Sequence, residues 1–114
     1  MTDLAQTYTD TLKVLGDTLV KMTSAEWDAL LMEATPEQRR EAMKTMLKTQ
    51  EARLTLANTA LAGIVEQLKE NEPALRKGIA RLEKSLATFE RIDSVVKGVA
   101  SVLNVVSKLV PMLA

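Results

Sequence analysis

Carboxylates are the side chains with the clearest potential for chemistry in this sequence. Asp3, Asp10 and Asp17 recur every seven residues, and evenly spaced acids can indicate a metal site. Residues seven apart on a helix lie about 10 Å apart along its axis, so these three cannot coordinate one ion together. The glutamates recur at spacings of four among lysines and arginines, which is typical of an exposed helix surface. We therefore expect the three aspartates to form a solvated face, and we expect no metal site.

The sequence contains neither cysteine nor histidine. This excludes thiol and imidazole nucleophiles or bases, zinc sites of the Cys/His type, haem ligation by these residues, and disulfides. A di-metal site in a helix bundle would use Glu-x-x-His motifs, which need a histidine. The four glycines are isolated and form no phosphate-binding loop. The sequence therefore predicts a protein that is not an enzyme, with no catalytic residues, cofactor or metal.

Charge is distributed unevenly along the chain, although the formal net charge is zero. Residues 1–35 hold six acids and two bases, whereas residues 73–91 hold five bases and two acids. A protein that binds nucleic acid usually has a strongly basic domain, because phosphate neutralisation dominates its affinity. We therefore predict that the acidic N-terminal segment lies near the basic later one, and that nucleic acid is not a partner.

The composition is that of one folded domain over residues 1–114. The chain is 46% apolar and 26% charged, with three aromatic residues, so its core must be built mainly from aliphatic side chains. No segment reaches the roughly 20 uncharged apolar residues that span a bilayer, and the N-terminus lacks a signal-peptide pattern. A cytoplasmic location is the expectation, with signal-independent secretion left open.

Helix signals run almost from end to end and predict an all-α bundle. Apolar residues at steps of three and four predict an N-terminal helix over 3–22, with Thr2 as its cap. Thr23 and Glu26 have the spacing of a capping box, which predicts a short helix over 24–34.

Two long helices are predicted for the rest of the chain. Thr35-Pro36-Glu37-Gln38 predicts a helix start with a capping box, because Thr35 can cap, proline suits the first helical position and Gln38 can reach back. Nothing interrupts the helical pattern from there until Asn71-Glu72-Pro73. Helices over 36–71 and 73–110 would measure about 54 and 57 Å, and such lengths need a partner helix. Their similar lengths predict a long antiparallel, coiled-coil-like hairpin that turns at Pro73, with the N-terminal helices packed on it.

A seven-residue leucine repeat offers an alternative to the hairpin. If Pro73 only bent the helix, the repeat would form one rod of about 75 residues, roughly 110 Å long, that pairs with another chain. Polar residues at intervening heptad positions and the turn-forming Asn-Glu-Pro sequence favour the hairpin. A DNA-binding zipper is not expected, because the bases upstream of Leu47 are mixed with glutamates. The repeat comprises Leu47, Leu54, Leu61, Leu68, Leu75 and Leu82, continued by Phe89, Val96, Leu103 and Val110.

Small and flexible side chains support two further expectations about packing. The cluster of small residues around Gly63, and the pair Gly78 and Ala80, are interpreted as tight helix crossings, because small residues let backbones approach closely. Met43 and Met46 flank the leucine repeat and are interpreted as core filling.

The apolar C-terminal segment is the strongest indication of function. From Ile92 onward, apolar residues form a broad stripe that needs a cover, because valine alone favours helix only weakly. The N-terminal helices, a second copy of the chain or a lipid interface could supply that cover. The scarcity of basic and aromatic border residues disfavours lipid.

These observations lead to a functional hypothesis and an alternative. The hypothesis is a helical interaction or scaffolding module that self-associates or docks a partner helix. The alternative is a membrane-associated protein whose C-terminal helix, about 92–114, binds or oligomerises at a bilayer. The predicted interaction surface comprises Leu54, Leu61, Val99, Leu103, Val106 and Val110.

Overall fold

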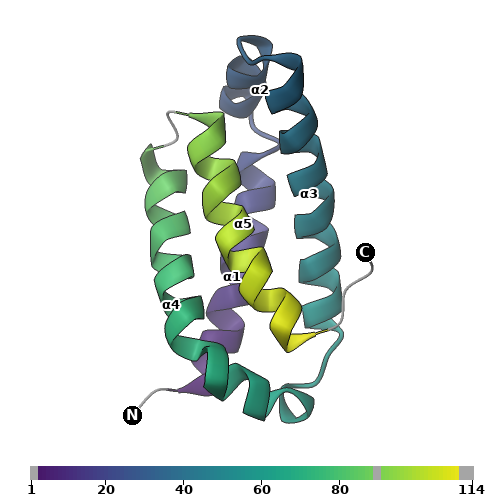
Figure 1. Ribbon diagram of the computed structural model, residues 1–114, viewed down its shortest axis with the longest axis vertical. Coiled ribbons are helices and arrows are strands. Elements are labelled where there is room, and N and C mark those ends of the chain that lie inside the picture. The colour runs from purple at the N-terminus through teal and green to yellow at the C-terminus, as the bar shows by residue number, and fades with distance from the viewer. Residues whose placement is uncertain (1–2, 89–90, 111–114) are drawn as a thin grey trace.

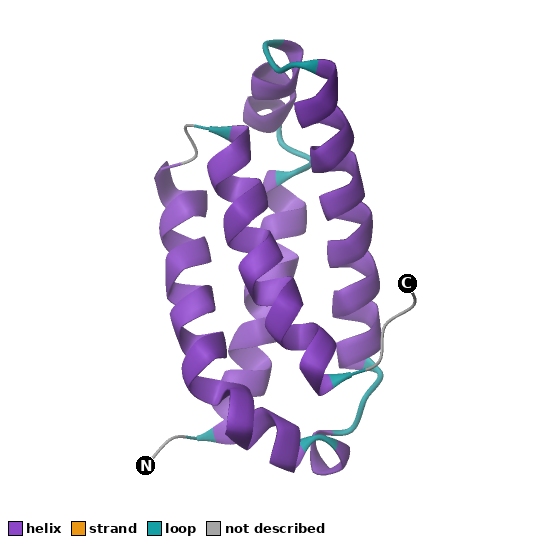
Figure 2. Ribbon diagram, in the orientation of Figure 1, coloured by secondary structure: helices purple, strands orange, loops and turns teal. Residues whose placement is uncertain are grey.

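The computed structural model describes residues 3–88 and 91–110. All regular structure in these two ranges is helical, as predicted (Figure 2). The elements are α1 (Leu4–Lys21), α2 (Ala25–Met32), α3 (Pro36–Ala57), the 3₁₀ turn η1 (Leu61–Gly63), α4 (Val65–Thr88) and α5 (Ile92–Leu109).

The four long helices α1, α3, α4 and α5 lie side by side in a bundle, and α2 lies at one end of it (Figure 1). Helix α1 contacts α3 and α4, and α5 contacts the same two helices, so the order around the bundle is α1, α3, α5, α4. The chain reverses direction from each long helix to the next (Figure 1). The bundle therefore consists of two antiparallel pairs, α1 with α3 and α4 with α5, and residues 58–64 cross from one pair to the other.

The hairpin turn predicted at Pro73 is wrong. The predicted helix 36–71 ends at Ala57, and Pro73 lies inside α4. The Tyr8 hydroxyl of α1 accounts for the early end, because its one proton is shared between the carbonyl oxygens of Leu56 (2.7 Å) and Thr59 (2.8 Å). Carbonyls at a helix end lack partners within the helix, and a bond from α1 stabilises the chain in leaving α3 here.

A proline inside a helix bends it because the ring removes one backbone hydrogen bond and crowds the preceding turn. Figure 1 shows that the first turns of α4 cross the lower end of the bundle before the helix turns along the bundle axis. Pro73 itself is exposed, so its ring displaces no core side chain. Asn71-Glu72-Pro73 therefore marks a bend within one helix and not a turn between two helices.

The second predicted long helix, 73–110, is also divided. Helix α4 ends at Thr88, and Arg91 has an extended backbone before α5 begins at Ile92. This break folds α5 back on α4, so the leucine repeat does not run through one rod. Neither Gly nor Pro marks the break in the sequence. Three predicted features lie outside the described residues: the cap Thr2, the repeat member Phe89 and the helix end at Pro111.

Side-chain caps define the starts of α2 and α3. The box predicted for Thr23 is wrong, because Ser24 caps α2 and its Oγ accepts from the Trp27 N–H at 3.2 Å. The Thr23 hydroxyl instead donates to carbonyls of the preceding helix. The predicted box at Thr35 is confirmed: its hydroxyl accepts from the Gln38 N–H at 3.1 Å, and the Gln38 amide oxygen accepts from the Thr35 N–H at 3.0 Å.

Helix α5 supplies much of the core. Val99, Val102 and Val106 have no exposed surface, so the apolar stripe of α5 is covered by the same chain. The tight crossing predicted at Gly78 is confirmed, because a Cβ there would lie 3.4 Å from Cγ2 of Val102 on α5. The crossing predicted around Gly63 is wrong, because this residue belongs to η1 and a Cβ there would meet nothing within 4 Å.

Candidate interaction surface

Helix α3 turns its smaller side chains inward and its larger apolar side chains outward. The exposed fraction is 56% for Met43, 55% for Leu47 and 64% for Leu54. The core face of α3 is buried and consists largely of alanine and threonine, namely Ala42, Thr45, Thr49, Ala52 and Leu56. Small inward side chains let α3 approach α1 and α5 closely, and leave no place in the core for the outer leucines. The interpretation of Met43 as core filling is therefore wrong, whereas Met46 does pack against the core.

The outward residues of α3 form a continuous stripe, which we call the α3 stripe. It comprises Met43, Leu47, Gln50 and Leu54, which are separated by steps of four, three and four residues. This spacing keeps the four side chains in one narrow line along the helix, as in the seam of a coiled coil. The line is about 16 Å long at 1.5 Å per residue.

A groove between α1 and α3 extends the α3 stripe sideways. Leu12 and Leu19 of α1 form one wall, and Gln50, Arg53 and Leu54 of α3 form the other, around a volume of about 330 Å³. The guanidinium end of Arg53 crosses toward α1, where a Cβ on Gly16 would lie 3.3 Å from its Nε. The glycine thus leaves room for Arg53 beside the groove.

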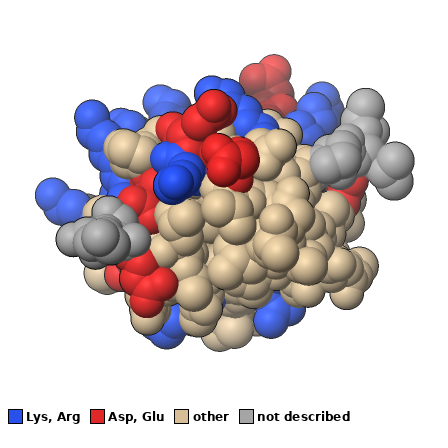
Figure 3. All heavy atoms as spheres, turned by 90° about the horizontal axis from the view of Figure 1, so that it is seen from below, with Lys and Arg blue, Asp and Glu red and all other residues tan. Residues whose placement is uncertain are grey.

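At its lower end the α3 stripe meets a surface without charge. Figure 3 views this end of the bundle and shows a broad uncharged area over its central and lower part, with most charged side chains above it and to its left. The chain has no charged residue between Arg53 and Glu66, a stretch that includes Leu54 and η1. Apolar contact at Leu54 can therefore spread around the end of the bundle without desolvating a charge.

The six residues predicted as an interaction surface separate into two groups. Leu54 is exposed on α3, and Leu61 is half-buried in η1. The other four are buried in the core of a single chain and are not surface residues: Val99, Leu103, Val106 and Val110. Leu47, from the same repeat as Leu54, is exposed as well but was not among the predicted surface residues. The alanines and threonines at the buried positions of α3 form a second stripe in the sequence. This stripe could have revealed that α3 turns its small side chains, and not its leucines, toward the core.

The three evenly spaced aspartates do not share a solvated face. Asp3 caps α1, and Asp17 lies 3.6 Å from the Lys13 ammonium at the surface. Asp10 is half-buried and forms a 2.6 Å ion pair with Arg76 of α4. The hydrogen bond from Arg76, supported by one from Gln6, lowers the pKa of Asp10. The predicted proximity of the acidic N-terminal segment and the basic later segment is confirmed at this pair.

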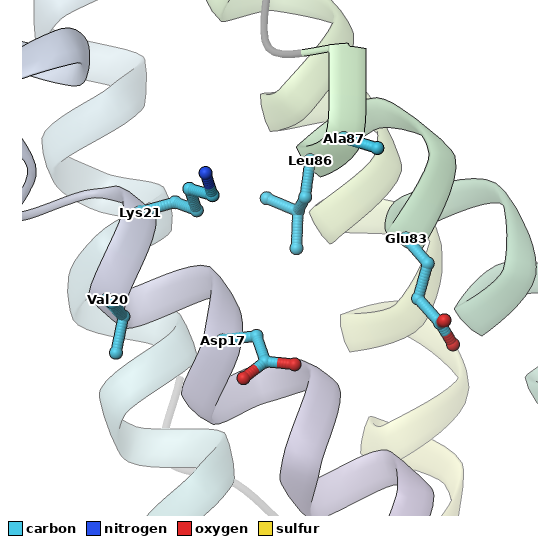
Figure 4. Close-up of a pocket in the computed structure, with 6 residues that line it drawn as sticks. All are labelled: Asp17, Val20, Lys21, Glu83, Leu86 and Ala87. Carbon is cyan, nitrogen blue, oxygen red and sulfur yellow. The ribbon is translucent and has the colours of Figure 1, made fainter.

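A second surface pocket lies between the upper parts of α1 and α4 and has a volume of about 320 Å³ (Figure 4). Leu86 extends from α4 toward α1, and Lys21 reaches across from α1. The carboxylates of Asp17 and Glu83 do not converge on a common point. Over residues 3–88 and 91–110, no three side chains of metal-ligating type gather closely enough to hold an ion.

Comparisons with known proteins identified no relative of this chain. No family model matches the chain, and no match was found among curated proteins or among solved structures. None of the helices in the described part of the chain combines the length and the apolar character that a membrane crossing requires. The geometry of the α3 stripe is thus the observation on which a function can be proposed.

Proposed function

We propose that this chain is a non-enzymatic helical interaction module that self-associates or docks a partner helix through the α3 stripe. One observation carries the proposal: α3 buries alanines and threonines while it exposes Met43, Leu47 and Leu54. An ordinary surface helix has the reverse distribution, with its large apolar side chains on the core face. The reversal is explained if a second surface covers the stripe.

The energetics of the stripe favour a helical partner. Burying one exposed leucine contributes about 1.5–3 kcal/mol, so two leucines and a methionine on one line can offset part of the cost of association. A narrow stripe with steps of four and three matches another helix, because side chains of one helix fit between those of the other at this spacing. The groove beside Leu54 adds depth to an otherwise flat face.

The membrane alternative has less support from the fold. It required the apolar stripe of the C-terminal segment to be available to lipid. Val99 and Val106, at the centre of that stripe, have no exposed surface. Val20 of α1 and Met32 of α2 are single exposed apolar side chains, and the other large ones that remain exposed lie on α3. Arg40, Lys44 and Glu51 stand beside them there.

Site-specific photo-crosslinking tests the proposal. A photoreactive amino acid at Leu47, introduced into the chain in its native cells, should give a discrete crosslinked product. The matched control is the same amino acid at Ala80, an exposed position on α4. A product from position 47 and none from position 80 is expected. Equal products from both positions, or none from position 47, would contradict a binding surface on α3.

A further inference from the structure

The α3 stripe has the alternation of a coiled-coil seam. In a heptad written a to g, Leu47 and Leu54 occupy a, and Met43 and Gln50 occupy d. The seam is apolar except at Gln50, near its middle. Because all four positions face away from the core of the bundle, the seam is available to a helix outside it.

Opposite charges stand beside this seam at one heptad position. Lys44 and Glu51 both occupy e, immediately after Met43 and Gln50. The Lys44 ammonium lies 3.9 Å from the Glu41 carboxylate, and both side chains are more than half exposed. An exposed contact of this kind contributes little, so it does not prevent Lys44 from meeting another carboxylate.

We infer that the helix covering the α3 stripe is α3 of a second copy of this chain, paired antiparallel about a two-fold axis. This inference rests on the proposed function and names its partner. In an antiparallel pair, a positions face d positions, so Leu47 faces Gln50 of the second copy. Met43 likewise faces Leu54 of the second copy. The two-fold axis makes each contact twice, because the same patch serves both chains.

Charge selects the antiparallel direction. Antiparallel helices bring e opposite e, so Lys44 faces Glu51 of the second copy, and the symmetric pair repeats this attraction. A parallel pair brings g opposite the following e, which leaves Glu51 beside Met46 of the second copy and gives Lys44 no carboxylate to meet. Arg39, the g residue before Lys44, is turned to the end of α2, where its Nε donates to the Leu31 carbonyl at 2.8 Å. Interhelical charges beside a seam set orientation even where each pair is weak. The charges of α3 thus complement each other in the antiparallel direction and not in the parallel one.

The groove between α1 and α3 fits the same arrangement. It opens beside Leu54, which the second copy's Met43 faces, and its far wall is formed by Leu12 and Leu19. Methionine is flexible enough to fill an irregular apolar space. The second copy's Met43 therefore enters this groove, and the contact extends from α3 to α1 on both chains.

A charge exchange between two chains tests the pairing. Sedimentation equilibrium measures the dimer Kd of the wild type, of Lys44→Glu alone, of Glu51→Lys alone, and of the two variants mixed. Each variant alone replaces two attractions by two repulsions, and its dimer Kd should rise about tenfold. In the mixture, each variant supplies the charge that the other needs, so association should return to the wild-type level.

Matched variants control for net charge and for folding. Lys84→Glu and Glu70→Lys make the same charge changes at exposed positions of α4 and should leave the dimer Kd unchanged. If Glu51→Lys melts at a lower temperature than the wild type, disulfide formation between introduced cysteines is measured instead of the charge exchange. The chain has no cysteine of its own, so only the introduced pair can react. A mixture of Met43→Cys and Leu54→Cys chains should form a heterodimeric disulfide faster than either variant forms a homodimer.

The outcomes separate this inference from the proposed function. A wild-type dimer whose Kd responds to neither charge reversal, or a mixture that associates no better than its components, overturns the antiparallel pair. A monomeric wild type combined with a crosslink from position 47 to a different protein also overturns it, while the proposed function stands. A monomer without any product specific to position 47 overturns both.

Discussion

At the scale of single residues, polar side chains of α1 organise the helices around it. The Tyr8 hydroxyl bonds to the end of α3, and Asp10 pairs with Arg76 of α4. The buried Thr7 hydroxyl donates to the Glu72 carboxylate of α4 at 2.8 Å. An unpaired carboxylate at this depth would be costly, so the bond from Thr7 helps to hold α4 against α1. The contacts of Asp10 and Thr7 hold the two antiparallel pairs together, and the contact of Tyr8 lies at the end of the first pair.

The ion pair of Asp10 predicts a pH dependence of stability. Arg76 lowers the pKa of Asp10 below its ordinary value of 3.8, so the pair adds stability above that pH. This stability is lost as the pH falls through the lowered pKa of the folded state. Asp10→Asn should therefore melt below the wild type at pH 7, and the difference should shrink toward pH 2. Thermal melts across this range measure it, with the exposed Asp28→Asn as control; a difference independent of pH would contradict the assignment.

The bond from Tyr8 predicts a local loss of stability. Tyr8→Phe keeps the ring and removes the hydroxyl that bonds to the carbonyls of Leu56 and Thr59. We expect a loss of about 1–2 kcal/mol in the free energy of unfolding, because both carbonyls lose the hydroxyl and only a backbone N–H remains on that of Leu56. Denaturant unfolding measures this loss, and hydrogen exchange should quicken in residues 58–64. Unchanged stability and exchange would show that the end of α3 does not depend on α1.

At the scale of elements, features set by neighbouring residues could be predicted from the sequence. Features set by contacts between distant residues could not. The capping box of Thr35 involves residues three apart, and it was predicted correctly. The end of α3 depends on Tyr8, almost fifty residues away in the sequence, which no local pattern reveals. The break before α5 carries neither Gly nor Pro. It is explained by the burial of the valine stripe that the break permits.

The candidate interaction surface shows the same limit of prediction from the sequence. Leu68, Leu75 and Leu82 are buried in α4, whereas Leu47 and Leu54, from the same seven-residue repeat, are exposed on α3. The phase of a repeat indicates a shared face only within one helix, and this repeat spans several elements. Once α3 and α4 are separate helices, their faces are chosen independently by what each one packs against.

The crossing of α4 and α5 predicts a difference between two glycines. A Cβ on Gly98 would lie 3.3 Å from Cδ1 of Leu82, whereas a Cβ on Gly63 would have open space. Gly98→Val should force the helices apart and reduce the free energy of unfolding by about 1–3 kcal/mol. Gly63→Val should change it by less than about 0.5 kcal/mol. Denaturant titrations of both variants make the comparison, and equal losses would argue against close packing at Gly98.

At the scale of the whole molecule, the bundle covers its most apolar helix and leaves α3 partly uncovered. Val106 has no exposed surface, whereas Val20 is 68% exposed on α1. Val106→Asp should cost several kcal/mol, because it buries a carboxylate without a partner, and Val20→Asp should be nearly neutral. Circular dichroism melts distinguish them. A Val106→Asp variant that melts normally but no longer binds vesicles to which the wild type binds would support the membrane alternative instead.

The central claim is that two copies of the chain associate through the α3 stripe, which is not a part of the fold of the single chain. Sedimentation equilibrium at micromolar concentration, applied to the wild type and to Leu47→Gln/Leu54→Gln, tests it most directly. The wild type should have twice the 12.5 kDa mass of one chain. The double variant should sediment as a monomer and keep its helicity and melting temperature, because both leucines are exposed in the single chain. A wild type that stays monomeric, or a double variant that stays dimeric, would contradict self-association through α3.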